Sequence, residues 1–212
     1  MVETIGPSSE DEMVAAFLRA EIEGSRYESQ VTTRMRQLGV TQTMVEEPDL
    51  ASDAENELRS RLLTAYRGWR VDRLLFEGWP NGLVWSRAAL EPADAPHIWY
   101  ANAPEWTELS RGTWRAAEGA RRVAARDPSL IGWRPETLEA IKGICAAIET
   151  GKSFPHVIAI GVPSGRIIML VEGHARMTAY LSVGLPDRLE ILYGAAPLTQ
   201  LQPWGWCPPS LR

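Results

Sequence analysis

The residues best suited to chemistry stand side by side in one short segment, Glu-Gly-His-Ala-Arg, at positions 172–176. The apolar run 167–171 predicts a buried strand that stops at Gly173, and a helical pattern starts directly after it. The unpaired amides of a helix start attract negative charge, and the helix dipole adds to this attraction. A glycine at the turn lets a phosphate approach the backbone closely. The segment therefore predicts an anion site, and a tight turn with a purely structural role is the alternative hypothesis.

The side chains of this segment extend the anion hypothesis. The Arg176 guanidinium can clamp phosphate oxygens in a bidentate way, and the His174 imidazole can donate a hydrogen bond or exchange a proton near neutral pH. Glu172 could hold Mg²⁺ or orient a hydroxyl, or could be a solvated carboxylate at a strand end. We assign ligand binding to Gly173, His174, Ala175 and Arg176, and catalysis to His174 and Glu172. Because the guanidinium is expected to face the ligand, its removal should weaken binding and change stability little.

A second loop offers further phosphate contacts. It precedes another predicted helix, which runs to about Arg126. Ser110, Gly112 and Thr113 in this loop could contact phosphate oxygens, and a helix cap with a turn is the alternative role for these three residues.

Composition limits the class of protein. The 212 residues, 45% hydrophobic and 23% charged, can bury a sizeable core, which excludes wholesale disorder and fibrous classes. A net charge of −5 argues against a protein whose main task is to neutralise nucleic-acid phosphates. The arginines crowded between positions 111 and 126 indicate a solvated helix face offset by nearby acidic residues, and a local basic patch is the alternative.

Targeting and metal signals are weak. No apolar run approaches the roughly 20 residues of a membrane span, and the first residues are acidic and polar, so we expect a cytoplasmic protein without membrane contact. The two cysteines and three histidines are widely spaced and form no ligand pattern, so we predict no structural metal site.

The elements that must position the 172–176 segment fall into two parts. We interpret residues 1–70 as an α-helical N-terminal extension and residues 71–212 as an α/β domain. In the extension we expect a frayed terminus over the first nine residues, helices over 10–23, 30–38 and 54–69, and a linker over 41–53.

In residues 71–212 the sequence pattern predicts strands and helices in mixed order. Short apolar runs between 71 and 99 favour short strands or a hairpin across Asn81 and Gly82. A helix is expected from Pro135 to Gly151, and most of the nine tryptophans should fill the core. Strands are expected at 157–161, 167–171 and 189–193, with a helix at 174–183. The fold class is therefore α+β (mixed α/β).

This order of elements and the motif from Gly173 to Arg176 resemble the ParB/sulfiredoxin superfamily of nucleotide-binding domains. The matching stretch extends from Leu138 to Leu192. Its pieces are the helix that ends at Gly151, the segment Phe154-Pro155-His156-Val157-Ile158, the turn Ser164-Gly165, the segment Leu170 to Arg176, Ala179, and Gly184 with the strand at 189–192.

The resemblance implies a small mixed sheet flanked by helices, with a nucleotide whose phosphates are held by Gly173, His174 and Arg176. It further implies a nucleoside triphosphate, ATP or CTP, and Mg²⁺ as cofactors. The implied activity is that of a phosphotransferase or nucleotide hydrolase that acts on a small acceptor. The alternative is a non-catalytic module in which a nucleotide or another anion controls association with a protein partner.

The chain departs from the family in three ways. Sulfiredoxin chemistry needs a cysteine inside the motif, where this chain has His174 and Ala175, so thiol chemistry is not expected. Few residues follow the last strand, so the DNA-binding helical domain of chromosome-partition relatives has no counterpart, and sequence-specific DNA binding is not expected. The acidic base that kinase members take from outside the motif has no match here.

Overall fold

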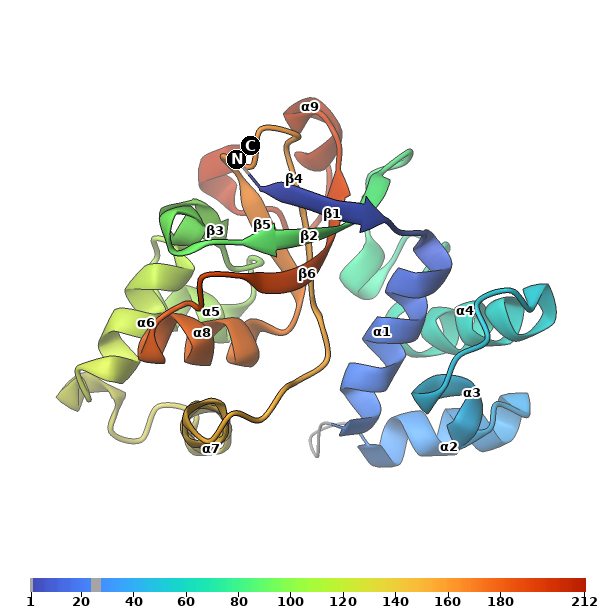
Figure 1. The fold of residues 1–212 in the computed structure, drawn as a ribbon, viewed down its shortest axis with the longest axis horizontal. Helices are drawn as coiled ribbons and strands as arrows, with labels where there is room; N and C mark the ends of the chain where they lie inside the picture. Colours follow the sequence, from blue (N-terminus) through green and yellow to red (C-terminus); the bar gives the residue numbers. More distant parts are fainter. Residues whose placement is uncertain (1, 24–27) are drawn as a thin grey trace.

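A six-stranded mixed sheet organises the chain, with helices packed on both of its faces (Figure 1). The structure is a computed structural model, and it describes residues 2–23 and 28–212. The strand order is β1-β2-β6-β4-β5-β3, in which β6 pairs parallel to β4, β5 pairs parallel to β3, and the other neighbours are antiparallel. The strands are β1 (Glu3–Pro7), β2 (Val84–Leu90), β3 (Ile98–Trp99), β4 (Val157–Gly161), β5 (Ile168–Glu172) and β6 (Leu189–Ala195). The predicted α+β class is confirmed.

The helices form two groups. The first group, which we call the helical lobe, contains α1 (Glu10–Glu23), α2 (Glu28–Leu38), α3 (Gln42–Glu46) and α4 (Asp53–Arg67). The second group contains α5 (Pro104–Leu109), α6 (Ala116–Ala124), α7 (Pro135–Glu149) and α8 (His174–Val183), and a short α9 (Leu198–Leu201) lies near the C-terminus. Short 3-10 turns occur at Leu74–Phe76, Pro92–His97, Pro128–Leu130 and Pro209–Leu211. In Figure 1 the helical lobe lies to the right of the group formed by α5 to α8.

The central strands are buried on both faces, which explains why they are apolar throughout. Along β4, Ile158 and Ile160 belong to the core shared with the helical lobe, whereas Val157 and Ala159 belong to the core shared with α6, α7 and α8. Successive side chains of a strand point to opposite faces, so a continuous apolar run is what a strand between two helical layers requires. The predicted boundaries of β4 and α8 agree with the structure.

The N-terminal segment corrects two predictions. Residues expected to fray form the edge strand β1, in which Glu3 lies opposite Ala89 and Thr4 opposite Ala88 of β2. Within the expected linker, the Thr41 hydroxyl accepts a hydrogen bond from the amide of Met44 at 3.2 Å and caps α3. The five residues of β1 include a single large apolar side chain, Ile5, and carry little hydrophobic signal, so partner strand β2 decides this structure. The N-terminal 70 residues therefore contribute a strand as well as helices.

Of the two alternatives for residues 71–99, short strands form at β2 and β3, whereas the hairpin across Asn81 and Gly82 does not form. The apolar run at 74–76 is a 3-10 turn, and β2 pairs with β1 and β6. The buried Phe76 ring packs edge-on against Trp69 and Trp79, with ring centroids 4.7 and 4.9 Å away. A short apolar run signals burial, and it does not distinguish a strand from a turn that fills an aromatic core.

Tryptophans fill the core of the helical lobe, as the sequence predicts. Trp204, from the C-terminal segment, packs edge-on against Trp79 at 5.5 Å and donates its indole N–H to the carbonyl of Leu75 at 2.7 Å. These contacts fix the proline-rich C-terminal segment to the turn after α4. The indole N–H is satisfied while the ring is buried, which is the arrangement that a core tryptophan favours.

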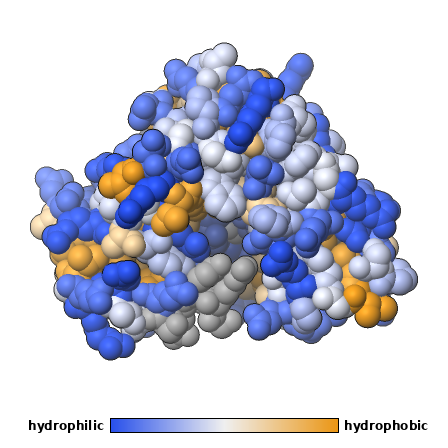
Figure 2. Space-filling view, turned by 180° about the vertical axis from the view of Figure 1, so that it is seen from behind, coloured by the Kyte–Doolittle hydropathy of each residue, from blue (hydrophilic) through white to orange (hydrophobic). Residues whose placement is uncertain are grey.

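The face of the molecule seen from behind is mostly hydrophilic, and its hydrophobic side chains form small, separate groups (Figure 2). Large apolar side chains that are exposed include Leu74, Val84 and Ile131. Within the described ranges, no helix combines the length and the apolar character that crossing a bilayer demands.

Candidate functional site

The predicted anion site forms a sharp turn between β5 and α8. Gly173 sits between them with φ 93°, in the left-handed region, and a Cβ at this position would lie 3.0 Å from Val157 Cγ2 and 3.1 Å from Arg176 Nη2. The first hydrogen bond of the helix runs from the amide of Met177 to the carbonyl of Gly173 at 2.8 Å. The amides of His174, Ala175 and Arg176 precede this bond, and the N-cap residue has no side chain to accept from them. The turn therefore presents helix-start amides beside a guanidinium.

The Arg176 side chain points into the protein and links α8 to β5 and to the segment before β4. Its Nη1 donates to the carbonyl of Pro155 at 2.7 Å, and more weakly to that of His156 at 3.4 Å, while Nη2 donates to Glu172 Oε1 at 2.8 Å. Only 9% of the side chain is exposed. The expectation that the guanidinium faces a ligand does not fit these contacts, and the expectation that its removal changes stability little stays a prediction. Its donors satisfy carbonyls of the segment that enters β4, while its charge stays close to the start of α8.

His174 is held as a neutral ring. Its Nε2 accepts a hydrogen bond from the amide of Ala101 at 3.2 Å, and the ring stacks on Trp106, with centroids 5.1 Å apart and planes 17° apart. Burial, together with the nearby Arg176, lowers the pKa of His174 to about 3. Because an imidazole that accepts at Nε2 carries its proton on Nδ1, the ring offers a neutral donor and no positive charge at pH 7. The predicted proton exchange near neutral pH does not suit this environment.

Behind the histidine, an aromatic stack extends into the core. The ring of Tyr100 lies 5.2 Å from Trp106, its hydroxyl lies 2.7 Å from that of Thr178, and burial raises its pKa. Thr178 in turn donates to the carbonyl of His174 at 2.7 Å. Sequence analysis missed Tyr100 and Trp106 as neighbours of the motif, since no local spacing links them to a helix so far along the chain. They fix the orientation of the imidazole.

Glu172 pairs with Arg176 through Oε1, and 26% of its side chain is exposed. The charge of Glu172 also acts on Glu21, a buried residue of α1. Burial raises the pKa of Glu21, Arg67 opposes this shift, and the negative charge of Glu172 adds to it. Among residues 2–23 and 28–212, no group of three or more His, Cys, Asp or Glu side chains could hold a metal ion. The side chains at the corner therefore do not fit a Mg²⁺ bound by protein alone.

The second predicted loop lies between α5 and α6 and precedes a helix, as the sequence predicts. Ser110, Gly112 and Thr113 lie in the turn after α5, and α6 starts only at Ala116. The buried Ser110 hydroxyl donates to the carbonyl of Trp106 at 2.8 Å and accepts from the amide of Trp114 at 3.0 Å. The Thr113 hydroxyl donates to the carbonyl of Ser110 at 2.8 Å. Both hydroxyls are engaged within the turn, because short polar side chains bond readily to nearby backbone. The structural alternative fits this loop better than phosphate binding.

The arginines between positions 111 and 126 are largely compensated by neighbouring acids. Arg111 and Arg122 both pair with Asp127, at 2.9 and 2.8 Å, and Arg121 pairs with Glu118 at 2.8 Å. The Arg122 guanidinium and the Ser129 hydroxyl and amide lower the pKa of Asp127 by hydrogen bonding to its carboxylate. These ion pairs argue against a basic patch. Arg111 and Arg121 fit the solvated helix face, whereas Arg122 is buried and donates to the carbonyls of Glu108 and Leu109.

Comparison of the chain with protein-family models, with curated proteins and with solved structures finds no match. The resemblance to the ParB/sulfiredoxin superfamily therefore stays a prediction that rests on the motif and on the order of elements. The arguments that follow depend on the geometry of the corner formed by β5, Gly173 and α8.

Proposed function

We propose that the chain binds a phosphate-containing ligand, in the first instance a nucleotide such as ATP or CTP, at the start of α8. The observation that carries this proposal is the turn at Gly173, which leaves the first amides of α8 without a capping side chain and places them beside the Arg176 guanidinium. Amides and the helix dipole attract phosphate oxygens. The Arg176 guanidinium lies beside them, with its charge compensated by Glu172.

The arrangement favours binding over catalysis. His174 is neutral, its Nε2 is engaged by Ala101, and the Glu172 carboxylate is engaged by Arg176. A general base needs an available lone pair, and both Nε2 of His174 and Oε1 of Glu172 are already engaged. We therefore propose a cytoplasmic, non-catalytic module in which the bound nucleotide controls association with a protein partner. A bound Mg²⁺ would then be held by the nucleotide phosphates.

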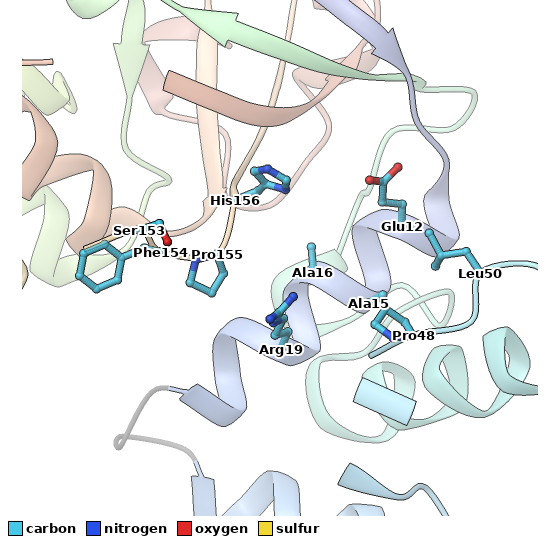
Figure 3. Close-up of a pocket in the computed structure, with 10 residues that line it drawn as sticks. All are labelled: Glu12, Ala15, Ala16, Arg19, Pro48, Leu50, Ser153, Phe154, Pro155 and His156. Atoms are coloured by element: carbon cyan, nitrogen blue, oxygen red, sulfur yellow. The ribbon is translucent and has the colours of Figure 1, made fainter. Parts of the chain in front are cut away.

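The helical lobe gives binding a route to a partner. Arg176 holds the carbonyls of Pro155 and His156, and these residues face α1 (Figure 3). A phosphate that attracts the guanidinium would compete with these two carbonyls for its donors. If the segment with Pro155 and His156 became less ordered, the packing of the helical lobe against the sheet would change. A ligand shifts such an equilibrium only by its difference in affinity between the two states.

The test places a charge where a phosphate would bind. Ala175→Glu puts a carboxylate into the first turn of α8. The helix dipole stabilises a negative charge at this position by about 0.3–1 kcal/mol, so the fold should persist. The same carboxylate should repel phosphate and weaken ATP binding by about tenfold or more, measured by calorimetry. Ala175→Gln is the matched neutral control and should bind ATP nearly as the unchanged chain does. Equal ATP affinity in the Glu and Gln variants, or no affinity in the unchanged chain, would overturn the proposal.

Turnover separates the module from the phosphotransferase or hydrolase that the resemblance implies. ATP or CTP is incubated with Mg²⁺ and the chain, with and without small hydroxyl acceptors. The nucleoside diphosphate formed, ADP or CDP, is then measured. We expect the chain to bind the nucleotide and to form ADP or CDP no faster than buffer alone does. Release that disappears in Ala175→Glu but persists in Ala175→Gln would instead assign enzymatic activity to this corner.

A further inference from the structure

A cleft with its own charged side chains lies beside β3, the strand at the edge of the sheet. It has a volume of about 600 Å³ and opens between the 3-10 turn Pro92–His97, the loop before α6 and the first turns of α6. This volume lies within the range of roughly 300–1,000 Å³ that small-molecule sites occupy. None of the side chains that line it belongs to the 172–176 segment, so the cleft is separate from the start of α8.

Arg115 has a fixed position in this cleft. Its guanidinium carbon lies 3.5 Å from the centroid of the Trp99 ring, and its Nη1 donates to the carbonyl of Pro96. The backbone of Arg115 also forms a bridge to Trp99 of β3. A planar guanidinium that is already stacked loses little conformational freedom when it pairs with an anion. The side chain is therefore oriented before a ligand arrives.

The positive charge of Arg115 has no acidic counterpart. Across residues 2–23 and 28–212, no Asp or Glu side chain forms an ion pair with it. The carboxylate that borders the cleft, Glu118, pairs instead with Arg121, whose Nε and Nη2 donate to its two oxygens at 3.2 and 2.8 Å. Burial lowers the pKa of Arg115, as expected for a guanidinium that leaves water without gaining a carboxylate. One positive charge in the cleft is thus open to an anion from outside.

The remaining donors of Arg115 select the kind of anion. Because Nη1 is engaged by Pro96, the parallel pair that remains is Nε with Nη2, and such a pair matches the two oxygens of a carboxylate. Hydrogen bonding from Arg121 lowers the pKa of Glu118, which therefore keeps its negative charge in the cleft. A singly charged anion meets less repulsion from this charge than a doubly charged phosphate ester does. Pro96 and Ala117 add apolar surface, one from each side of the cleft, which suits the body of an organic acid.

We propose that this cleft binds a small organic carboxylate, which pairs with Nε and Nη2 of Arg115 and places its apolar body between Pro96 and Ala117. The His97 imidazole borders the same space and can donate an N–H to a carboxylate oxygen. The cleft selects against the neutral analogue of the same acid, because the charge of Arg115 then stays unpaired. It selects against a phosphate ester of the same size through the charge of Glu118.

Benzoate is the probe, and its binding to the full chain is measured by NMR titration. It should bind about tenfold or more tightly than benzyl alcohol, which keeps the ring and lacks the charge, and more tightly than phenyl phosphate. Arg115→Gln should weaken benzoate binding by about tenfold or more. Arg166→Gln is the matched control, because Arg166 is an exposed arginine of the turn between β4 and β5 outside the cleft, and affinity should stay within about twofold.

A second pair of variants keeps Arg115 in place. Ala117→Glu adds a carboxylate to the first turn of α6, where the helix dipole stabilises negative charge, so the fold should persist. This carboxylate should compete with benzoate for Arg115 and weaken binding by about tenfold or more, whereas Ala117→Gln should leave the affinity nearly unchanged. ATP binding at the start of α8 should be equal in these two variants.

The proposal fails if benzoate does not bind the unchanged chain, or if phenyl phosphate binds it more tightly than benzoate does. It also fails if Ala117→Glu and Ala117→Gln bind benzoate equally while circular dichroism shows both variants folded. Loss of benzoate binding in Ala175→Glu, together with its retention in Ala117→Glu, would assign the acid to the start of α8 and exclude the cleft.

Discussion

Arg176 and Glu172 form an ion pair across the glycine turn, with Arg176 Nη2 donating to Glu172 Oε1 at 2.8 Å. The two residues are four positions apart, one at the end of β5 and the other in the first turn of α8. The same guanidinium also bonds to the carbonyl of Pro155, which precedes β4. One side chain therefore ties together two strands and a helix at the corner proposed to bind phosphate.

Arg176→Met should destabilise the chain substantially. It leaves the Glu172 carboxylate without its partner and the carbonyl of Pro155 without a donor, in a site where the arginine side chain is 9% exposed. Loss of one partner of a buried pair costs about 3–5 kcal/mol, so we expect a loss of about 2–4 kcal/mol for this partly buried pair, measured by urea unfolding. Arg188→Met, which removes an exposed pair with Glu3, should cost less than about 1 kcal/mol. Equal losses in the two variants would contradict the bracing role.

His174 should make stability depend on pH. Burial lowers its folded pKa to about 3, from an ordinary value of 6.5, so the unfolded chain binds a proton that the folded chain does not bind between these values. The contribution of His174 is therefore fully present above pH 6.5 and is lost as pH falls toward 3, by about 1.4 kcal/mol for each pH unit at most.

His174→Gln isolates this effect, because glutamine can accept from the amide of Ala101 and does not titrate. Urea unfolding of both chains between pH 7.5 and 4.5 gives the measurement. The stability difference between the unchanged chain and the variant should shrink as pH falls. A difference that stays constant over this interval would show that the imidazole titrates near its ordinary value.

Gly173→Ala should lower the free energy of unfolding more than the same substitution at an ordinary left-handed glycine does. A Cβ at 173 would lie 3.0 Å from Val157 Cγ2 and 3.1 Å from Arg176 Nη2, whereas Gly151, with φ 81°, has open space around its Cβ position. Gly151→Ala therefore measures the backbone strain alone, of about 1 kcal/mol. We expect Gly173→Ala to exceed this by about 1–2 kcal/mol in thermal or urea unfolding. Equal costs would mean that the turn has room for a side chain.

Strand β1 should protect the outer edge of β2. Deletion of residues 2–7 removes the partner of Ala88 and Ala89. Hydrogen exchange in β2 should then become faster at the amides that bond to β1, while amides that bond to β6 stay protected. The full chain is the control. Unchanged exchange at both sets of amides would contradict the assignment of β1 to the sheet.

Elements with a strong local pattern could be predicted from the sequence. The strand over 157–161, the helix over 174–183 and the glycine between β5 and α8 are all read correctly, because apolar runs and glycine turns depend on nearby residues. The helix over 10–23 is predicted correctly for the same reason. The α+β class follows from the order of these elements.

The roles of the site residues depend on contacts that form when distant segments fold together. The partners of Arg176 and His174 come from segments far along the chain, Pro155 from the approach to β4, and Ala101 and Trp106 from the region after β3. A guanidinium or imidazole has the same formula whether it is solvated or enclosed, and its hydrogen-bond partners and pKa depend on what surrounds it. Edge strand β1 likewise forms because β2 offers it unpaired backbone groups, and no local pattern records that contact.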